Sequence, residues 1–282
     1  MNFSSILKAV RNGEPATIPT GWTQGRATFG GLVAAMLYQS IEAELEQASQ
    51  GAAADTPLRS LTISFVAPAE AGTLQTRAQV LRAGRSVVQI EAHASQQGKG
   101  EQTGEQVVTA ALASFGKPRT SSIAVATEAA PEFPAPETCE ALPYIEGVVP
   151  EFTRHFEYRI GAGALPFSGH SEGCIGGWVR FRESAGPVST AHLLALIDAW
   201  PPAVLPMLKT VAPASSLTWT IELMPAAIQA TTDSAHADNS DWWQYLAEVE
   251  QAEDGYAVIQ ASLWNASGVL MALTRQTVSV FA

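Results

Sequence analysis

The chain has 282 residues, of which 46% are hydrophobic and 15% charged, and its formal net charge is −11. This composition is typical of a well-packed globular protein with one large or two smaller domains, and it argues against a disordered chain. The acidic balance and the absence of any basic cluster argue against nucleic-acid binding, because phosphate neutralisation requires grouped Lys and Arg.

The N-terminal residues 1–19 lack the long apolar core of a signal peptide. No run in the chain reaches the roughly 18–20 apolar residues that are needed to span a bilayer. Cys139 and Cys174 have no metal-ligand spacing, and we expect free, buried thiols rather than a disulfide. The five histidines show no metal-ligand spacing either. We therefore expect a cytoplasmic protein with no membrane partner, no metal and no cofactor.

The first half contains one apolar helix followed by a run of strands. The helix, FGGLVAAMLYQSIEAELEQ, begins near Gly30 and is apolar almost all round at its start, which predicts that it is buried. An S-L-T strand that ends at Pro68 follows it, and then three segments with strand-like alternation. The turn AGRS, residues 83–86, separates the second strand from the third.

The second half repeats this order. HFEYRIG and IGGWVRFRES are its expected opening strands, and the apolar helix STAHLLALIDAW has Ser189 or Thr190 as its N-cap. We expect Pro201 and Pro202 to stop the helix, because proline lacks the N–H donor. A second S-L-T strand ends at Pro225, and three strands follow, with the turn EDGY between the second and third.

The two halves are joined by a segment rich in Ala, Pro, Glu and Thr, which reads as a linker. We predict an N-terminal domain over residues 1–118, a linker over 119–149 and a C-terminal domain over 150–282. In each domain, a curved antiparallel sheet wrapped around one helix buries the helix's apolar surface, which makes the fold class α+β. Neither sheet closes its own edge, so we expect the two to pair into one long sheet.

Asp198 is the most unusual residue of this pattern. It is the only formally charged side chain in TAHLLALIDAWPPAVLP, residues 190–206. An unpaired carboxylate in such surroundings costs several kcal/mol, and desolvation raises its pKa and makes it a better base toward water. It is therefore a candidate general base; the alternative is an Asp bonded to a backbone N–H or facing solvent at the helix end.

Five segments resemble the double hotdog acyl-CoA thioesterases, the acyl-CoA thioesterase II-like family. They are GWTQGRATFGGLVAAML, RSLTISFVAPAEAGTL with RAGRS after it, LLALIDAWPPA, SSLTWTIELMP and LWNASGVLMALTRQ. Their order and spacing cover nearly the whole chain. The resemblance implies a double hotdog fold and the hydrolysis of acyl-CoA thioesters.

The resemblance also implies the site residues. Family members are thought to use an Asp, a hydroxyl and a Gln to hold the attacking water, which here are Asp198, Ser216 or Thr218, and Gln276. Ser216 and Thr218 are two apart on a strand and are expected to face the same side. At the first helix, Gly31 and Gly30 are our candidate oxyanion donors, because a helix N-terminus offers free N–H groups.

Two alternatives to a thioesterase remain open. Other hotdog enzymes, hydratases and dehydratases, pair an acid with a histidine, but His192 lies about 240° round an ideal helix from Asp198. A non-catalytic protein that binds acyl-CoA or lipid would need none of these side chains. The first helix carries no acid at the place where the second carries Asp198, because residues 32–40 are neutral throughout. We therefore expect one active site per chain, with the first half giving the oxyanion donors or the acyl pocket. We also expect a homo-oligomer, at least a dimer.

Overall fold

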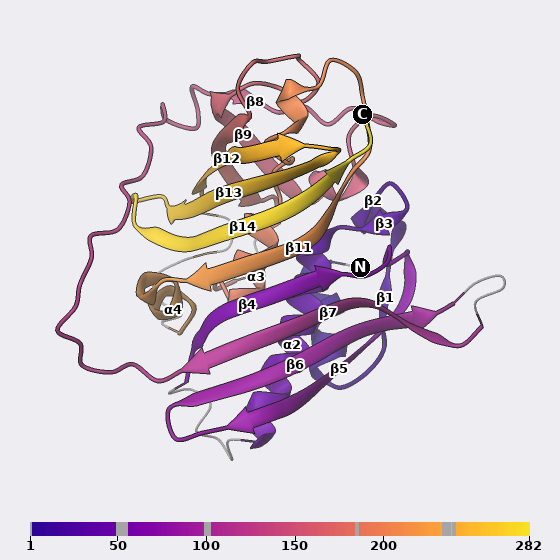
Figure 1. The fold of residues 1–282 in the computed structure, drawn as a ribbon, viewed down its shortest axis with the longest axis vertical. Helices are drawn as coiled ribbons and strands as arrows, with labels where there is room; N and C mark the ends of the chain where they lie inside the picture. The colour runs from indigo at the N-terminus through magenta and orange to yellow at the C-terminus, as the bar shows by residue number, and fades with distance from the viewer. Residues whose placement is uncertain (1, 49–55, 99–102, 184–185, 233–237, 239–240) are drawn as a thin grey trace. The chain divides into compact units, whose positions relative to one another are not determined.

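The computed structural model describes residues 2–48, 56–98, 103–183, 186–232, 238 and 241–282 (Figure 1). The chain divides into two compact units. The N-terminal unit consists of Met1–Val125 with Pro150–Phe152, and the C-terminal unit consists of Ala126–Val149 with Thr153–Ala282.

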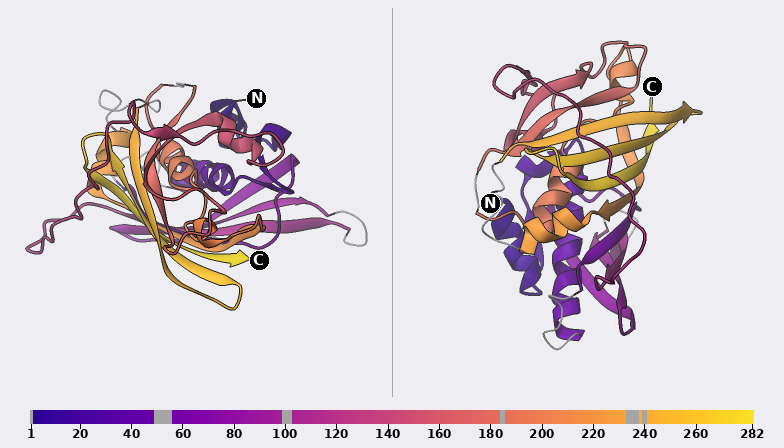
Figure 2. Two further views of the ribbon diagram at one scale, coloured as in Figure 1. Left: turned by 90° about the horizontal axis from the view of Figure 1, so that it is seen from above. Right: turned by 90° about the vertical axis from the view of Figure 1, so that its left-hand side faces the viewer.

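The N-terminal unit is an antiparallel sheet that packs against one long helix. The strand order is β1-β5-β6-β7-β4, and α2 packs on β5 and β6 (Figure 2). The unit's elements are α1 (Phe3–Arg11), β1 (Ala16–Ile18), η1 (Thr20–Trp22), β2 (Thr23–Gln24), β3 (Ala27–Thr28), α2 (Gly30–Ala48), β4 (Leu58–Phe65), β5 (Gly72–Ala83), β6 (Val87–Gln97) and β7 (Glu105–Gly116).

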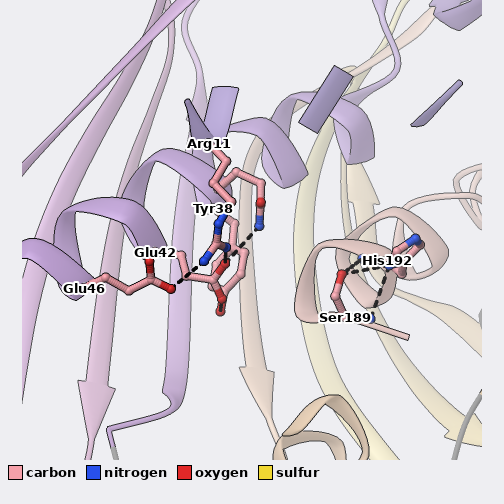
Figure 3. A network of polar contacts seen from close by, with 7 residues as sticks. Arg11, Tyr38, Glu42, Glu46, Ser189 and His192 are labelled. Carbon is pink, nitrogen blue, oxygen red and sulfur yellow. Dashed lines mark hydrogen bonds and ion pairs between the residues drawn. The ribbon is translucent and has the colours of Figure 1, made fainter. Parts of the chain in front are cut away.

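Helix α2 is buried over its first two turns and polar at its far end. Its residues from Gly31 to Gln39 are all buried, as the apolar sequence predicts. At the polar end, Arg11 of α1 reaches two carboxylates that lie one turn apart, Glu42 at 2.6 Å and Glu46 at 2.6 Å (Figure 3). This forked ion pair holds α1 against α2.

The C-terminal unit repeats the arrangement with more strands, in the order β11-β14-β13-β12-β10-β9-β8. Its elements are β8 (Glu140–Ala141), η3 (Glu151–His155, which begins in the N-terminal unit), β9 (Phe156–Gly163), β10 (Cys174–Phe181), α3 (Thr190–Ile197), η4 (Leu205–Met207), β11 (Ala214–Leu223), α4 (Pro225–Thr232), β12 (Trp243–Glu253), β13 (Tyr256–Asn265) and β14 (Leu270–Val280). The expected strands and both expected turns are confirmed, and each unit is a sheet packed on a helix.

Residues 126–149 lie on the C-terminal unit rather than forming a free linker. The indole of Trp264 donates to the backbone oxygen of Glu128 at 3.2 Å, and the indole of Trp178 donates to that of Pro134 at 2.9 Å. Strand β8 then adds to the sheet edge at β9. Both cysteines are free thiols as expected, but they are half-buried rather than buried. Within the described residues, no helix is both long enough and apolar enough to cross a membrane.

Helix α3 is shorter than the sequence predicts. All eight of its residues are buried, and Ser189 is its N-cap, but the helix ends at Ile197 with Asp198 as the C-cap residue. The expectation that Pro201 and Pro202 stop the helix is therefore wrong by about one turn. The difference matters because Asp198 lies at the end of the buried helix and not on its side.

The start of α3 is held by a capping box between Ser189 and His192 (Figure 3). The Ser189 Oγ lies 2.7 Å from His192 Nδ1, and the backbone N–H of Ser189 donates to the same nitrogen at 3.2 Å. Burial lowers the pKa of His192 to about 4, although the charge of Asp238 acts in the opposite direction. The imidazole is therefore neutral at physiological pH and serves the helix cap.

This cap predicts a pH-dependent stability. The unfolded chain binds a proton at His192 below about pH 6.5 and the folded chain only near pH 4, so the folded state loses stability as the pH falls through that window. The loss reaches about 3 kcal/mol. His192→Gln keeps an S-x-x-Q capping box without a titrating group, so it flattens this part of the profile. Urea unfolding at pH 7.5 and 4.5 checks this, and equal pH dependence in the two proteins would contradict it.

Candidate active site

The carboxylate of Asp198 lies at the C-terminal end of α3, where the chain leaves the helix. Its backbone, with φ −93° and ψ −1°, is still close to helical, and its side chain is half-buried. The backbone of the next residue, Ala199, is held by the sheet, because the hydroxyl of Tyr158 on β9 donates to its oxygen at 3.0 Å. A buried helix and a strand hydrogen bond thus determine where the carboxylate sits.

Gln276 on β14 holds this carboxylate directly. Its side-chain Nε2 donates to Asp198 Oδ1 at 2.8 Å. The backbone of Gln276 is paired on both sides, with Trp219 of β11 and Ile259 of β13, so the amide extends from a central strand. A hydrogen bond from a neutral amide to a carboxylate is charge-assisted and roughly twice as strong as one between neutral groups. The structure therefore brings together two of the residues that the sequence singled out.

Three aromatic side chains pack next to Asp198, and sequence reasoning identified none of them as a site residue. Trp200 stacks on Tyr245 with ring centroids 6.0 Å apart and an interplanar angle of 5°, and it meets Tyr158 edge-on at 5.5 Å. Tyr158 and Tyr245 are both buried. They come from β9 and β12, 40 or more residues from Asp198 in the chain, and look like ordinary strand aromatics in the sequence.

The two tyrosines stay neutral. Burial raises the pKa of Tyr158 well above its usual value; Arg182 opposes the shift, and the charge on Asp198 adds to it. Burial also raises the pKa of Tyr245, again with a contribution from Asp198. Both phenols therefore remain protonated at physiological pH, and they are uncharged neighbours of Asp198.

Ser216 and Thr218 do not share a face of β11, so that expectation is wrong. The register of β11 against β14 shifts between them: Ser216 pairs with Val278 and Thr218 with Thr277, which leaves Leu217 as the extra residue of a β-bulge. Because directly paired residues point to the same side and Gln276 and Val278 are two apart, Ser216 lies on the face of Gln276. Thr218 is exposed on the other face.

The N-terminal unit presents the two glycines at the start of α2. Gly31 is buried and Gly30 is half-buried. The backbone N–H groups of Leu32 and Val33 donate to the Phe29 oxygen, whereas within the described residues the N–H groups of Gly30 and Gly31 have no hydrogen-bond partner. These two N–H groups are the donors that a helix N-terminus offers to an oxyanion.

The described part of the chain contains no group of three or more His, Cys, Asp or Glu side chains arranged to hold a metal ion. The residues around Asp198 are an amide, two neutral phenols and an indole. These groups suit proton transfer and hydrogen bonding to a water molecule.

Two family models match the chain. Residues 18–116 match the acyl-CoA thioesterase N-terminal domain, and residues 136–280 match the acyl-CoA thioesterase C-terminal domain. Together they account for most of the sequence, and each falls on one of the two sheet-and-helix repeats. No curated protein matches the chain.

Solved structures share the fold at low sequence identity. A conserved hot dog fold protein of unknown function from Alicyclobacillus acidocaldarius has a TM-score of 0.77 at 22% identity, over 95% of this chain and 92% of its own. An acyl-CoA thioesterase II from Mycobacterium marinum has a TM-score of 0.69 at 16% identity, over 98% of each chain. The dehydratase domain of RzxB from Pseudomonas fluorescens has a TM-score of 0.52 at 15% identity, over 89% of this chain and 84% of its own. These likenesses show the fold.

Proposed function

The chain belongs to the acyl-CoA thioesterase family, and on that premise we propose that it hydrolyses acyl-CoA thioesters to a free acid and CoA through a water molecule activated by Asp198. The observation that carries this proposal is the hydrogen bond from Gln276 Nε2 to Asp198 Oδ1 at the end of a buried helix. It supports the proposal because the carboxylate lies beside an amide that hydrogen-bonds without changing charge.

Asp198 and Gln276 divide the task of holding the water. The Nε2 donor of Gln276 is used on the carboxylate, which fixes its orientation, and the amide's carbonyl oxygen is the acceptor that takes one hydrogen of the water. The other hydrogen points to the Asp198 carboxylate. This orientation directs a lone pair of the water oxygen toward the thioester carbonyl.

The reaction is then an addition of water to the thioester carbon and a loss of thiolate, with Asp198 carrying the proton from one to the other. As the water oxygen bonds to the thioester carbon, Asp198 takes the water's proton and the carbonyl oxygen becomes an oxyanion. The C–S bond breaks with its electron pair on sulfur, and the proton returns from Asp198 to the departing thiolate. The products are the carboxylic acid and CoA thiol, and the carboxylate base is regenerated.

The amides of Gly31 and Gly30 are our proposed oxyanion donors. Within the described residues they have no other hydrogen-bond partner, and they stand at the positive end of the 19-residue helix α2. Hydrogen bonds to an oxyanion from backbone N–H groups need no side chain, which fits the neutral sequence of this helix over residues 32–40.

Ser216 is our proposed hydroxyl for the site, because it lies on the face of Gln276. We expect Ser216→Ala to lower kcat about tenfold, the effect of losing one hydrogen bond to a reacting water. Thr218→Ala is the matched variant on the same strand, and we expect it to keep wild-type kcat because its side chain faces away. Steady-state kinetics of both variants with one acyl-CoA checks this, and a larger loss in Thr218→Ala would contradict the assignment.

The hydratase or dehydratase alternative is weakened by the position of His192. His192, the nearest imidazole in the sequence, is bonded to Ser189 at the other end of α3. It lies about 9 Å along the helix from Asp198, at a rise of about 1.5 Å per residue. Such enzymes need an acid and an imidazole close to the same part of the substrate. Here Asp198 and His192 lie at opposite ends of α3.

The proposal is tested with a panel of acyl-CoAs from short to long chains. Thiol release is followed continuously, and the products are identified by mass spectrometry. We expect free acid and CoA from one range of chain lengths. A 3-hydroxyacyl-CoA formed from an enoyl-CoA would favour the hydratase, and tight binding without cleavage of any member would favour a non-catalytic binder.

A further inference from the structure

The C-terminal unit concentrates its few positive charges in one place. It carries seventeen acidic and six basic side chains, so it bears the whole formal charge of the protein. Three of the six basic residues lie close together in the sheet: Arg159 on β9, Arg180 on the neighbouring strand β10, and Arg182 directly after β10. A polyanionic ligand that approaches this unit meets repulsion over most of it and attraction here.

Strand register gathers these arginines on one face. Arg180 pairs with Glu157, and Trp178 pairs with Arg159. Val179 and Phe181 alternate with Arg180 and Arg182 and are buried, so the arginines point away from the core. Arg182 directly follows β10, and its backbone N–H donates to the His155 oxygen. The side chains of Arg159 and Arg180 therefore lie on the outer face of the paired strands β9 and β10, and Arg182 follows directly at the end of β10.

One carboxylate is shared between two of the arginines. Arg159 Nη2 lies 2.6 Å from Glu157 Oε1, and Arg180 Nη2 lies 2.7 Å from Glu157 Oε2. Burial acts to raise the pKa of Glu157, but Arg180 first, then Arg159 and Arg182, outweigh it and lower the pKa. Arg182 is exposed, and within the described residues it forms no ion pair. Three positive charges thus face one negative charge.

An indole completes the cluster. The guanidinium carbon of Arg180 lies 4.2 Å from the ring centroid of Trp242, and that of Arg159 lies 5.8 Å from it. Cation–π contacts at these distances restrict the guanidinium groups and lower the entropy lost when they bind an anion. The half-buried ring is also the type of surface on which a nucleobase packs.

The cluster lies beside the proposed catalytic site in the sheet, because Arg159 directly follows Tyr158 on β9. Arg182 and Asp198 act with opposite sign on the same hydroxyl, that of Tyr158, which in turn donates to the residue after Asp198. Arg182 thus lies within electrostatic reach of the site while its side chain is exposed to solvent. An extended substrate with a reactive end and a charged end fits such a pair of sites.

We propose that Arg159, Arg180 and Arg182, together with Trp242, bind the phosphate-bearing nucleotide end of the acyl-CoA substrate. This inference rests on the proposed function, because acyl-CoA is the substrate that joins a thioester to a phosphorylated nucleotide. Arginine is suited to the task, since its planar fork bonds phosphate oxygens in pairs. Arg182, which forms no ion pair among the residues that the structure describes, supplies a positive charge to the ligand, and Glu157 and Trp242 hold the other two arginines in place.

The test compares Arg182→Ala with Arg275→Ala, which removes another exposed arginine of the same unit, one paired with Glu250 on the sheet. KM is measured for an acyl-CoA and for the matching acyl-N-acetylcysteamine thioester, which lacks the nucleotide. In Arg182→Ala we expect the KM for acyl-CoA, divided by the KM for the N-acetylcysteamine thioester, to rise about tenfold. This factor corresponds to the loss of roughly one charged hydrogen bond. Arg275→Ala keeps the wild-type ratio, and Arg182→Lys restores part of it.

Direct binding keeps this test independent of catalysis. Calorimetry with adenosine 3′,5′-bisphosphate is expected to give about tenfold weaker binding in Arg182→Ala than in wild type, and adenosine without phosphates is expected to show no difference. If the protein binds the bisphosphate through Arg182 but cleaves no thioester, the proposed function is wrong and nucleotide binding by the arginine cluster is supported. Equal bisphosphate affinity in wild type, Arg182→Ala and Arg275→Ala would contradict nucleotide binding by this arginine cluster, whatever the hydrolytic activity.

Discussion

Replacing Asp198 by Asn is expected to lower kcat for acyl-CoA hydrolysis about 10²- to 10⁴-fold, the typical contribution of a general base. Asn has nearly the same shape and still accepts a hydrogen bond from Gln276, which donates to Asp198 at 2.8 Å. It has no basic oxygen that accepts a proton from water. The variant should therefore fold and bind substrate with little change in KM while losing turnover.

The matched control is Asp254→Asn. Asp254 lies in the turn between β12 and β13 with φ 52°, a backbone conformation that Asn adopts as readily as Asp. Near-ultraviolet circular dichroism and thermal unfolding should give the same result for both variants and for wild type, and only Asp198→Asn should lose kcat. Retention of wild-type kcat in Asp198→Asn would make Asp198 a structural residue and remove the basis of the mechanism.

Replacing Gln276 by Met is expected to lower kcat about ten- to hundredfold. Methionine fills a similar volume without an amide, so the carboxylate loses a charge-assisted hydrogen bond, worth about 1.5–3 kcal/mol, and the water loses its acceptor. The amide also stabilises the charged carboxylate, so the acid limb of the kcat profile should move to higher pH. Stopped thiol-release assays between pH 5 and 8 measure both effects.

Gln260→Met is the control for this substitution. Gln260 is exposed on β13, and its amide bonds Glu248 at 3.4 Å. We expect this variant to keep both the kcat and the pH profile of wild type. If both variants lose kcat equally and the profile keeps its position, Gln276 supports the sheet and has no role toward Asp198.

The sequence pattern predicts the repeated sheet-and-helix units because each is encoded locally. Period-two alternation predicts strands, an apolar run predicts the buried helix α3, and Asp254-Gly255 predicts a hairpin turn. Asp198 stands out because a charge within an apolar run is visible without any tertiary information. Its partner Gln276 is 78 residues away, and only the resemblance to a known family identified it.

Other parts of the site depend on tertiary contacts that the sequence does not display. The bulge at Leu217 reverses the side on which Thr218 lies, and no glycine or proline marks it. Tyr158 and Tyr245 gain their importance only because strand pairing brings them to the end of α3. The early end of that helix at Ile197 is likewise set by packing, since the first proline comes four residues later.

The central claim is that Asp198 acts as a base on water and is not itself acylated. The most direct test is a single-turnover reaction with excess protein, quenched at intervals and examined by intact-protein mass spectrometry alongside thiol release. Direct attack by water predicts that the protein mass never changes and that free acid appears at the same rate as CoA thiol. An acyl adduct that forms with thiol release and maps to the peptide containing Asp198 would contradict it, and would make the carboxylate a nucleophile.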